Sequence, residues 1–429
     1  MTEPSSPSIG GAAHTPPGNP YLVLALLLLV YIFNIADRVL LGVMAGPIKL
    51  ELGLSDTELG ILGGTAFALF YATLGVLIAW IADRRSRSWI VTVSLTLWSA
   101  FTAACGLATN FLQLFAARLL VGVGEAGGVA PSYSLISDYF PPSQRARALA
   151  VYSFGIPMGS AIGLSLGGVI ATNVDWRTAF IYMGVAGMLT APLFKAVVRD
   201  PVRGGYETRQ PAERPHLREA LRTLRRKPSF WLLALGSSLG ATASYGVTFW
   251  IPTFYVRSFG VPLSHAAMMY AAIILVAGVI GAWAGAWMTD RFGPARPVSY
   301  VAIPVAALLL SLPFYLGAVS VESALLSAAL LTAPTALGAM CYGPILAAVQ
   351  NVSPPAMRTT ASAMFLLVNN LIGLGFGSAV LGFISDALQQ RYGDESLRQA
   401  LLAGSLFYLG AAMIWALAAL HARRDWEVR

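Results

Sequence analysis

The chain has 429 residues, of which 56% are hydrophobic and only 11% are charged. A soluble globular protein carries about 25% charged residues, so this composition excludes an ordinary soluble domain and indicates a membrane protein. The net charge of +8 is typical of nucleic-acid-binding proteins, but here the basic residues lie in short loops between apolar runs and form no aromatic-interleaved groove, which argues against a nucleic-acid partner.

The first 19 residues are rich in Pro, Ser and Gly and carry no Lys or Arg. They lack the basic segment of a secretory signal, and we expect a disordered tail. Twelve hydrophobic segments follow, each of about 20 or more residues, the length that a spanning helix needs. The expected spans are 20–45, 56–82, 89–108, 111–137, 148–172, 176–198, 229–256, 264–289, 297–318, 322–350, 359–387 and 398–420. The pattern predicts an all-α integral membrane protein.

The longest polar stretch, 199–228, divides these spans six and six. The predicted organisation is a tail (1–19), a six-helix half (20–198), a central loop (199–228), a second six-helix half (229–420) and a tail (421–429). Within the loop, Leu217, Ala220, Leu221 and Leu224 recur at helical spacing among arginines. That spacing suits an amphipathic helix on an anionic membrane surface, and a solvated connector is an equal alternative.

The distribution of Lys and Arg predicts the orientation in the membrane. With both termini in the cytoplasm, twenty-one of these residues lie in cytoplasmic segments and five in outer loops. Loops rich in Lys and Arg stay on the cytoplasmic side. We therefore expect a multi-pass protein of the cell membrane, inner or plasma, with both termini in the cytoplasm.

Four ionisable residues lie within two predicted spans: Asp37 and Arg38 in the first, Arg118 and Glu125 in the fourth. A charge at bilayer depth costs at least ~2.5 kcal/mol and persists where it is paired or faces an aqueous cavity. Arg118 and Glu125 are about 10 Å apart along their helix, too far for a direct pair. Asn34, Asp37 and Arg38 share one face of the first helix. We hypothesise that Asp37 lies near Arg118 and Arg38 near Glu125.

The second half carries no Asp, Glu, Lys, Arg or His in its membrane cores and offers aromatic and amide side chains instead. The candidates for lining a central cavity, together with Asn34 of the first half, are Tyr245, Trp250, Tyr342, Asn369 and Asn370. A cavity that is charged on one wall and apolar on the other suits an amphipathic anion, whose phosphate or carboxylate would meet Arg38 and Arg118. Each aromatic residue taken alone is more often a packing residue than a ligand contact.

The two halves repeat one another. The motif Asp83-Arg84 follows the second span and Asp290-Arg291 follows the eighth, and paired prolines follow the fourth and tenth spans. Two matched pairs at similar offsets indicate duplication of a six-helix unit. Six plus six helices with a central loop is an architecture in which two halves rock about a site near the membrane midplane.

With these motifs the chain resembles the Major Facilitator Superfamily. The loop Asp83-Arg84-x-Ser86-Arg87, the stretch Arg118-x-x-x-Gly122-x-Gly124-Glu125 and the glycine-rich fifth span are similar to motifs of that superfamily, although Ala79 and Ser86 replace usual glycines. The resemblance implies twelve helices in two pseudo-symmetric halves, alternating access and a monomer. It also implies that charged residues at cytoplasmic helix ends form ion pairs between the halves that favour the outward-open state: Asp83, Arg84, Arg87, Asp138, Arg145, Arg147, Asp290 and Arg291. The alternative is surface charge that merely follows the positive-inside rule.

Within the superfamily, the chain resembles the spinster-homologue group, proposed carriers of sphingolipids and lysophospholipids. The residues that carry this resemblance are Asn34-x-x-Asp37-Arg38, the block 121–126 and the stretch Ile156-Pro157-Met158-Gly159-Ser160. The resemblance implies a lipid carrier. A symporter of small organic anions such as sugar acids is the competing interpretation.

The same residues predict coupling to protons. Burial raises the pKa of a carboxyl group and a nearby guanidinium lowers it, so opening the site changes the protonation of the carboxyl group. We expect Asp37 and Glu125 to exchange protons and release an arginine for the substrate; a fixed network that only locks two helices is the alternative. The four histidines lie in the tail, loops or helix ends, with no metalloprotease or nucleophile motif. We therefore expect no enzyme activity, metal or cofactor.

Overall fold

The computed structural model describes residues 17–206, 222–293, 296, 298–354 and 357–425. Most of the expected N-terminal tail, the central-loop residues Leu217, Ala220 and Leu221, and the last four residues lie outside this part. Within it, the chain forms α-helices with short 3-10 and π segments and no strand. The prediction of an all-α protein is confirmed.

The first half forms six helical rods, three of them broken near the middle. They are α1 (Pro20–Leu52), α2 (Asp56–Gly63) with α3 (Thr65–Ala82), α4 (Arg87–Cys105), α5 (Phe111–Glu125) with α6 (Val129–Tyr139), α7 (Pro142–Ser153) with α8 (Gly155–Asn173), and α9 (Trp176–Val197). Polar caps fix several starts: Asn19 accepts from the Tyr21 amide, Asn110 from Gln113 and Asp175 from Thr178. The breaks at Gly64, 126–128 and Phe154 were not predicted.

The second half forms six further rods in the described chain. They are α11 (Pro228–Phe259), α12 (Leu263–Phe292), α13 (Ser299–Ser320), α14 (Ala324–Asn351), α15 (Arg358–Asn369) continued through the π segment η2 (Asn370–Leu374) into α16 (Gly375–Tyr392), and α17 (Ser396–Asp425) after the short η3 (Gly393–Glu395). Ten stretches are long and apolar enough to cross a membrane; the last, Thr360–His421, contains two rods, and α11 falls outside this set.

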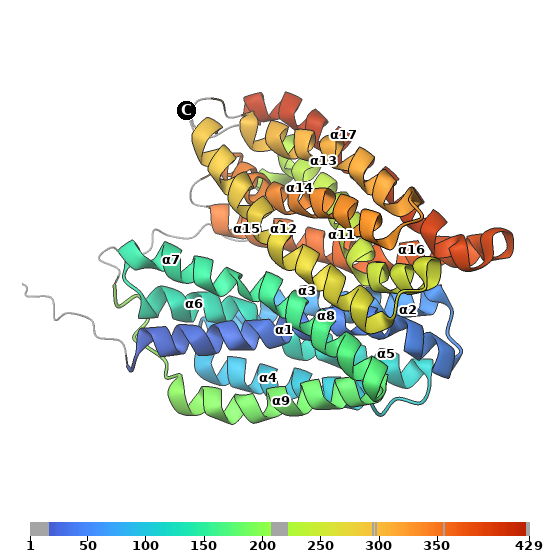
Figure 1. Ribbon diagram of the computed structural model, residues 1–429. Helices are drawn as coiled ribbons and strands as arrows, with labels where there is room; N and C mark the ends of the chain where they lie inside the picture. Colours follow the sequence, from blue (N-terminus) through green and yellow to red (C-terminus); the bar gives the residue numbers. More distant parts are fainter. Residues whose placement is uncertain (1–16, 207–221, 294–295, 297, 355–356, 426–429) are drawn as a thin grey trace, which may run out of the picture.

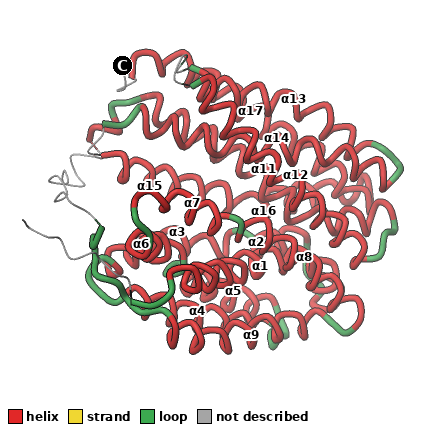
Figure 2. Tube along the Cα trace, turned by 60° about the vertical axis from the view of Figure 1, so that its left-hand side comes forward, coloured by secondary structure: helices red, strands yellow, loops and turns green. Residues whose placement is uncertain are grey.

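The two halves form two bundles that lie against one another with their rods running in a common general direction (Figure 1). A turned view again shows α1 to α9 on one side and α11 to α17 on the other (Figure 2). Both ends of the described chain lie at one end of the molecule. We call this the terminal end; it includes the loop around residues 83–87. The opposite end includes residues 52–56 and 259–263.

The halves approach most closely at the opposite end, where glycines allow backbone contact. A Cβ atom on Gly60 of α2 would lie 2.4 Å from the Ser378 carbonyl oxygen of α16, and one on Gly382 would lie 2.2 Å from the Asp56 carbonyl oxygen. Ser378 Oγ also donates a hydrogen bond of 2.7 Å to the Gly60 carbonyl. This contact closes the opposite end.

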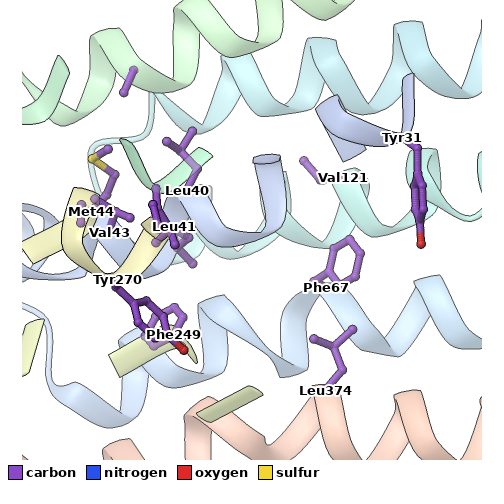
Figure 3. Close-up of a cluster of buried hydrophobic side chains, with 14 of the residues drawn as sticks. Tyr31, Leu40, Leu41, Val43, Met44, Phe67, Val121, Phe249, Tyr270 and Leu374 are labelled. Atoms are coloured by element: carbon purple, nitrogen blue, oxygen red, sulfur yellow. The ribbon is translucent and has the colours of Figure 1, made fainter. Parts of the chain in front are cut away.

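One hydrophobic cluster continues from the first half into the second. Figure 3 shows Leu41 of α1 between Leu40 and Phe249 of α11, and the ring of Phe67 between Val121 and Leu374. A Cβ atom on Gly42 would lie 2.9 Å from the Phe249 carbonyl oxygen, so α1 and α11 pack closely. The cluster holds the middle of α1 between the two halves.

Candidate functional site

Glu125, the last residue of α5, is fully buried and binds two side chains of α1. Its Oε2 accepts hydrogen bonds of 2.8 Å from Arg38 Nε and 2.9 Å from Asn34 Nδ2. The Arg38 side chain is 16% exposed and that of Glu125 is 0% exposed. The expected proximity of Arg38 and Glu125 is confirmed, and Arg38 is the accessible member of the pair.

Arg118 and Asp37 form the second expected pair, but with looser geometry. Arg118 Nη1 lies 3.6 Å from Asp37 Oδ2, and the two side chains are 0% and 1% exposed. Neither oxygen of Asp37 and none of the three guanidinium nitrogens of Arg118 has a hydrogen-bond partner among the described residues. A buried ion pair needs hydrogen bonds to offset its desolvation, so this pair is incompletely stabilised.

Two glycines bring α5 close enough to its neighbours for these contacts. A Cβ atom on Gly122 would lie 2.4 Å from the Phe67 carbonyl oxygen of α3, and one on Gly124 would lie 2.6 Å from the Trp98 amide of α4. Without side chains at these positions, α5 packs closely on α3 and α4, and its Arg118 and Glu125 side chains reach the charged face of α1.

Aromatic rings of α3 flank both arginines. Phe67 and Tyr71 stack with centroids 5.0 Å apart and an interplanar angle of 23°. The Arg38 Cζ atom lies 4.9 Å from the Phe67 centroid and 4.3 Å from that of Tyr71, and Arg118 Cζ lies 5.6 Å from Phe67. Sequence reasoning missed both rings. The only signal was aromatic spacing of i, i+4, which is common in apolar spans.

Three tyrosines near Arg38 line a space between the halves. Tyr133 of α6, Tyr245 of α11 and Tyr342 of α14 are 41%, 37% and 56% exposed, yet they lie deep within the protein and close to Tyr71. Exposed side chains surrounded by protein line an internal space. Tyr245 and Tyr342 were expected there, whereas Tyr133 was not.

Other residues predicted to line the cavity have different environments. Trp250 is fully buried, and its indole donates a hydrogen bond of 2.9 Å to the Ser378 carbonyl, so it packs α11 against α16. The prediction that Trp250 lines the cavity is therefore wrong. Asn369 is buried at the end of α15, and Asn370 is half-buried at the start of η2. Asn34 belongs to the Glu125 network described above.

At the terminal end, Arg87 is the centre of an ion-pair cluster between the first half and the start of the central loop. Its guanidinium binds Asp138 and lies 3.6 Å from Asp200 Oδ1. Asp200 also accepts hydrogen bonds from the Ser86 and Ser88 hydroxyls and the Arg87 amide. Burial raises the pKa of Asp200, but these hydrogen bonds outweigh it and hold the pKa below its usual range.

The remaining predicted gating residues make local contacts or are exposed. Arg84 lies over the Trp80 ring at 4.0 Å, and Arg145 donates a hydrogen bond of 2.7 Å to the Ser137 carbonyl. The other four, Asp83, Arg147, Asp290 and Arg291, are exposed. The described ion pairs of this end join Arg87 to Asp138 of the first half and to Asp200 at the start of the central loop. The gating role of the whole set stays a prediction.

An ion-pair cluster that the sequence reasoning missed joins the halves at the opposite end. Asp56, fully buried at the start of α2, accepts two hydrogen bonds of 2.7 Å from Arg257 of α11, one of 2.6 Å from Lys49 and one of 2.7 Å from Ser385. Asp386 accepts hydrogen bonds of 3.0 and 2.7 Å from the backbone amides of Asp56 and Thr57. Lys49 and Arg257 are two of the five Lys and Arg residues that the predicted orientation places in outer loops, and that position is the only sequence signal for this cluster.

Comparison with known proteins places this arrangement in a family. Residues 27–378 match the Major Facilitator Superfamily. An MFS-type efflux pump of Mycolicibacterium smegmatis is 34% identical over 411 residues, 95% of each chain. Human protein spinster homolog 1 is 27% identical over 405 residues, 89% of this chain and 76% of that protein.

A solved structure has the same fold. The bacterial homolog to the human lysosomal transporter spinster, in an inward-facing and unoccupied conformation, matches with a TM-score of 0.86 and 28% identity over 95% of this chain and 98% of that one. A nucleoside transporter, NupG, shares the fold at 14% identity with a TM-score of 0.74. This chain therefore belongs to the Major Facilitator Superfamily, and it is a multi-pass membrane transporter of the spinster group rather than an enzyme.

Proposed function

We propose that this protein is a proton-coupled secondary transporter that moves an amphipathic anionic lipid, of the lysophospholipid or sphingolipid type, by alternating access. The observation that carries the proposal is the position of Arg38. It is the exposed member of a buried ion pair and lies beside a space lined by tyrosines of both halves. A phosphate or carboxylate needs such a guanidinium, and an acyl chain needs such an apolar wall.

Exchange of partners at Arg38 links the proton to the substrate. Protonation of Glu125 removes the negative charge that holds Arg38 Nε at 2.8 Å. The guanidinium is then free to bind an anionic head group through two parallel hydrogen bonds. Asn34 retains Glu125 through its amide, so the carboxyl group stays in place for the next cycle.

The Asp37–Arg118 pair is a second proton site in this proposal. Because its polar atoms lack hydrogen bonds in the described part of the chain, a change of charge at Asp37 disrupts few existing contacts. Arg118, fully buried and then without its counter-charge, is driven to move toward another anion. In this proposal the two carboxyl groups bind protons and the two guanidinium groups bind the anion.

The orientation also belongs to the proposal. The terminal end carries most of the Lys and Arg residues, so we place it, with both termini, in the cytoplasm of a cell membrane. The structure is closed at the opposite end, which in that orientation is an inward-facing conformation, like that of the related solved structure. The protein acts as a monomer. The efflux-pump relative favours net export.

Uptake of labelled lysophospholipid into proteoliposomes with an imposed pH gradient tests the proposal. Protein-free liposomes report spontaneous flipping, and Glu322→Gln, an exposed carboxylate, is the matched control for Glu125→Gln and Asp37→Asn. We expect gradient-dependent flux in the wild type and control, and loss of the gradient response in the two site variants. Absence of protein-dependent lipid flux would contradict the lipid substrate and favour small organic anions such as sugar acids.

A further inference from the structure

The two ion pairs of the site share one neighbour. Phe67 of α3 is fully buried, and its ring lies 4.9 Å from the Arg38 guanidinium carbon and 5.6 Å from that of Arg118. Arg38 belongs to the pair with Glu125, and Arg118 to the pair with Asp37. A single aromatic ring therefore contacts the cation of each pair.

The ring lies on a path from the accessible arginine to the buried one. Tyr71, half-buried, stacks on Phe67 at 5.0 Å and contacts Arg38 alone, at 4.3 Å. Exposure falls from 16% for the Arg38 side chain to 0% for Arg118. An event at the accessible end of this path reaches Arg118 through Phe67.

A shared ring creates dependence between its two cations. The negative face of an aromatic ring attracts a guanidinium, and the attraction strengthens when water is excluded. Arg118 has no hydrogen-bonded partner among the described residues, so its described stabilising contacts are the ion pair with Asp37 and the Phe67 ring. When Arg38 moves away toward an anion, the ring is left to Arg118, and the balance between Arg118 and Asp37 changes.

We propose that Phe67 is a positioning residue that couples the two ion pairs, so that binding of an anion at Arg38 changes the proton affinity at Asp37. This inference rests on the proposed function, in which protons and an anion compete for these groups. Asp37 and Glu125 face one another and the guanidinium groups of Arg38 on α1 and Arg118 on α5, whereas Cys105 on α4 faces Asp37 and Tyr71 on α3 faces Arg38.

A plain packing role is the alternative, and fluorination separates the two. Adding fluorine atoms to a phenylalanine ring weakens its attraction for cations with little change in size. The series is introduced at Phe67, at Tyr71 and, as a control, at Phe180. Phe180 is fully buried in α9, where its ring packs on Trp176 at 6.0 Å. Transport of labelled lysophospholipid is measured against pH and substrate concentration for each.

We expect the series at Phe67 to raise KM by about threefold to tenfold and to shift the midpoint of the pH profile by about half to one unit, graded with fluorine number. The series at Tyr71 should raise KM and leave the midpoint within about 0.2 units, since its ring contacts Arg38 alone. The series at Phe180 should change neither quantity.

Three outcomes overturn the inference and can be told apart. A pH-dependent wild type with an unshifted midpoint across the Phe67 series makes Phe67 a packing residue and leaves the proposed function intact. A wild type with no pH dependence refutes proton coupling and the role of Phe67 together. Loss of transport in Phe67→Leu with full activity in the fluorinated series would also identify packing.

Discussion

Two clusters of carboxylates and cations differ in how completely their atoms are bonded. At the opposite end, both oxygens of Asp56 accept hydrogen bonds, from Arg257, Lys49 and Ser385. In the central site, Glu125 uses one oxygen, and Asp37 has no hydrogen-bond partner within the described chain. Similar residue types thus make a fully hydrogen-bonded contact between the halves at the opposite end. In the central site they make a cluster whose free donors and acceptors allow it to change partners.

The number of hydrogen bonds that its carboxylates already make decides whether a cluster stabilises the fold or can bind a proton or an anion. Removing one cationic partner from a fully bonded buried carboxylate leaves part of its charge uncompensated. An ion pair with spare donors and acceptors can accept a proton or an anion with fewer bonds to break. The comparison predicts that the ion pairs of the opposite end contribute most to the free energy of unfolding, and that those of the central site change partners during transport.

Arg257→Met should have the largest effect on stability, because it removes two hydrogen bonds from buried Asp56. We expect a loss of about 3 kcal/mol in the free energy of unfolding, measured by unfolding of the purified protein in detergent. Arg291→Met, at an exposed position, is the control. Equal stability of the two variants would show that Asp56 does not depend on saturation by Arg257.

Double-mutant cycles compare the two central pairs. We expect a coupling energy of about 2 kcal/mol between Arg38 and Glu125, which are hydrogen-bonded, and about 1 kcal/mol or less between Asp37 and Arg118 at 3.6 Å. The cycles use Arg38→Met with Glu125→Gln, and Arg118→Met with Asp37→Asn, read from unfolding. A larger coupling for the second pair would reverse the order of the two contacts.

Asp386 tests the hydrogen bonds that the α2 backbone makes to the second half at the opposite end. Asp386→Ala removes the acceptor for the amides of Asp56 and Thr57 and should cost about 1 kcal/mol, as loss of a helix N-cap does. Asp386→Asn keeps an acceptor oxygen and should cost about half as much. Both are measured by unfolding. Identical losses would mean that the charge, rather than the hydrogen bond, stabilises the start of α2.

The smallest effect should come from Asp200, in the partly exposed cluster at the terminal end. Its folded-state pKa lies below the usual range because of the Ser86 and Ser88 hydrogen bonds, which outweigh the effect of burial. The carboxylate therefore stabilises the folded protein above its unfolded-state pKa, and this contribution is lost as pH falls through the folded-state pKa. Asp200→Asn should flatten the acid side of the stability profile by less than about 1 kcal/mol. Asp290→Asn reports the effect of an exposed charge, and an equal flattening there would contradict the assignment.

The sequence predicted the helical rods and the central pairing because both follow from local rules. Apolar length fixes the spans, and the i, i+3, i+4 spacing of Asn34, Asp37 and Arg38 fixes one charged face. The breaks at Gly64 and Phe154 depend on contacts between distant segments and have no such local rule. Trp250 illustrates the limit: helical spacing alone does not say whether a ring faces the cavity or, as here, the neighbouring α16.

Residues that act through aromatic contact were also beyond the sequence. Phe67 and Tyr71 resemble many other rings in apolar spans, and only their distances to Arg38 and Arg118 distinguish them. The Asp56–Arg257 contact joins residues 201 positions apart. Such a pairing requires the docking of two halves, which composition and periodicity do not describe.

Because the backbones of Gly60 and Ser378 are in contact, a single methyl group added at Gly60 is enough to separate the two helices. A Cβ atom at Gly60 would lie 2.4 Å from a carbonyl oxygen, and backbone cannot turn aside as a flexible side chain can. Gly60→Ala therefore separates the two bundles at the opposite end, where their backbones are in contact, and it removes no charge. The altered protein offers a way to capture the conformer that is open at the opposite end for imaging, with the ionic groups of the central site unaltered.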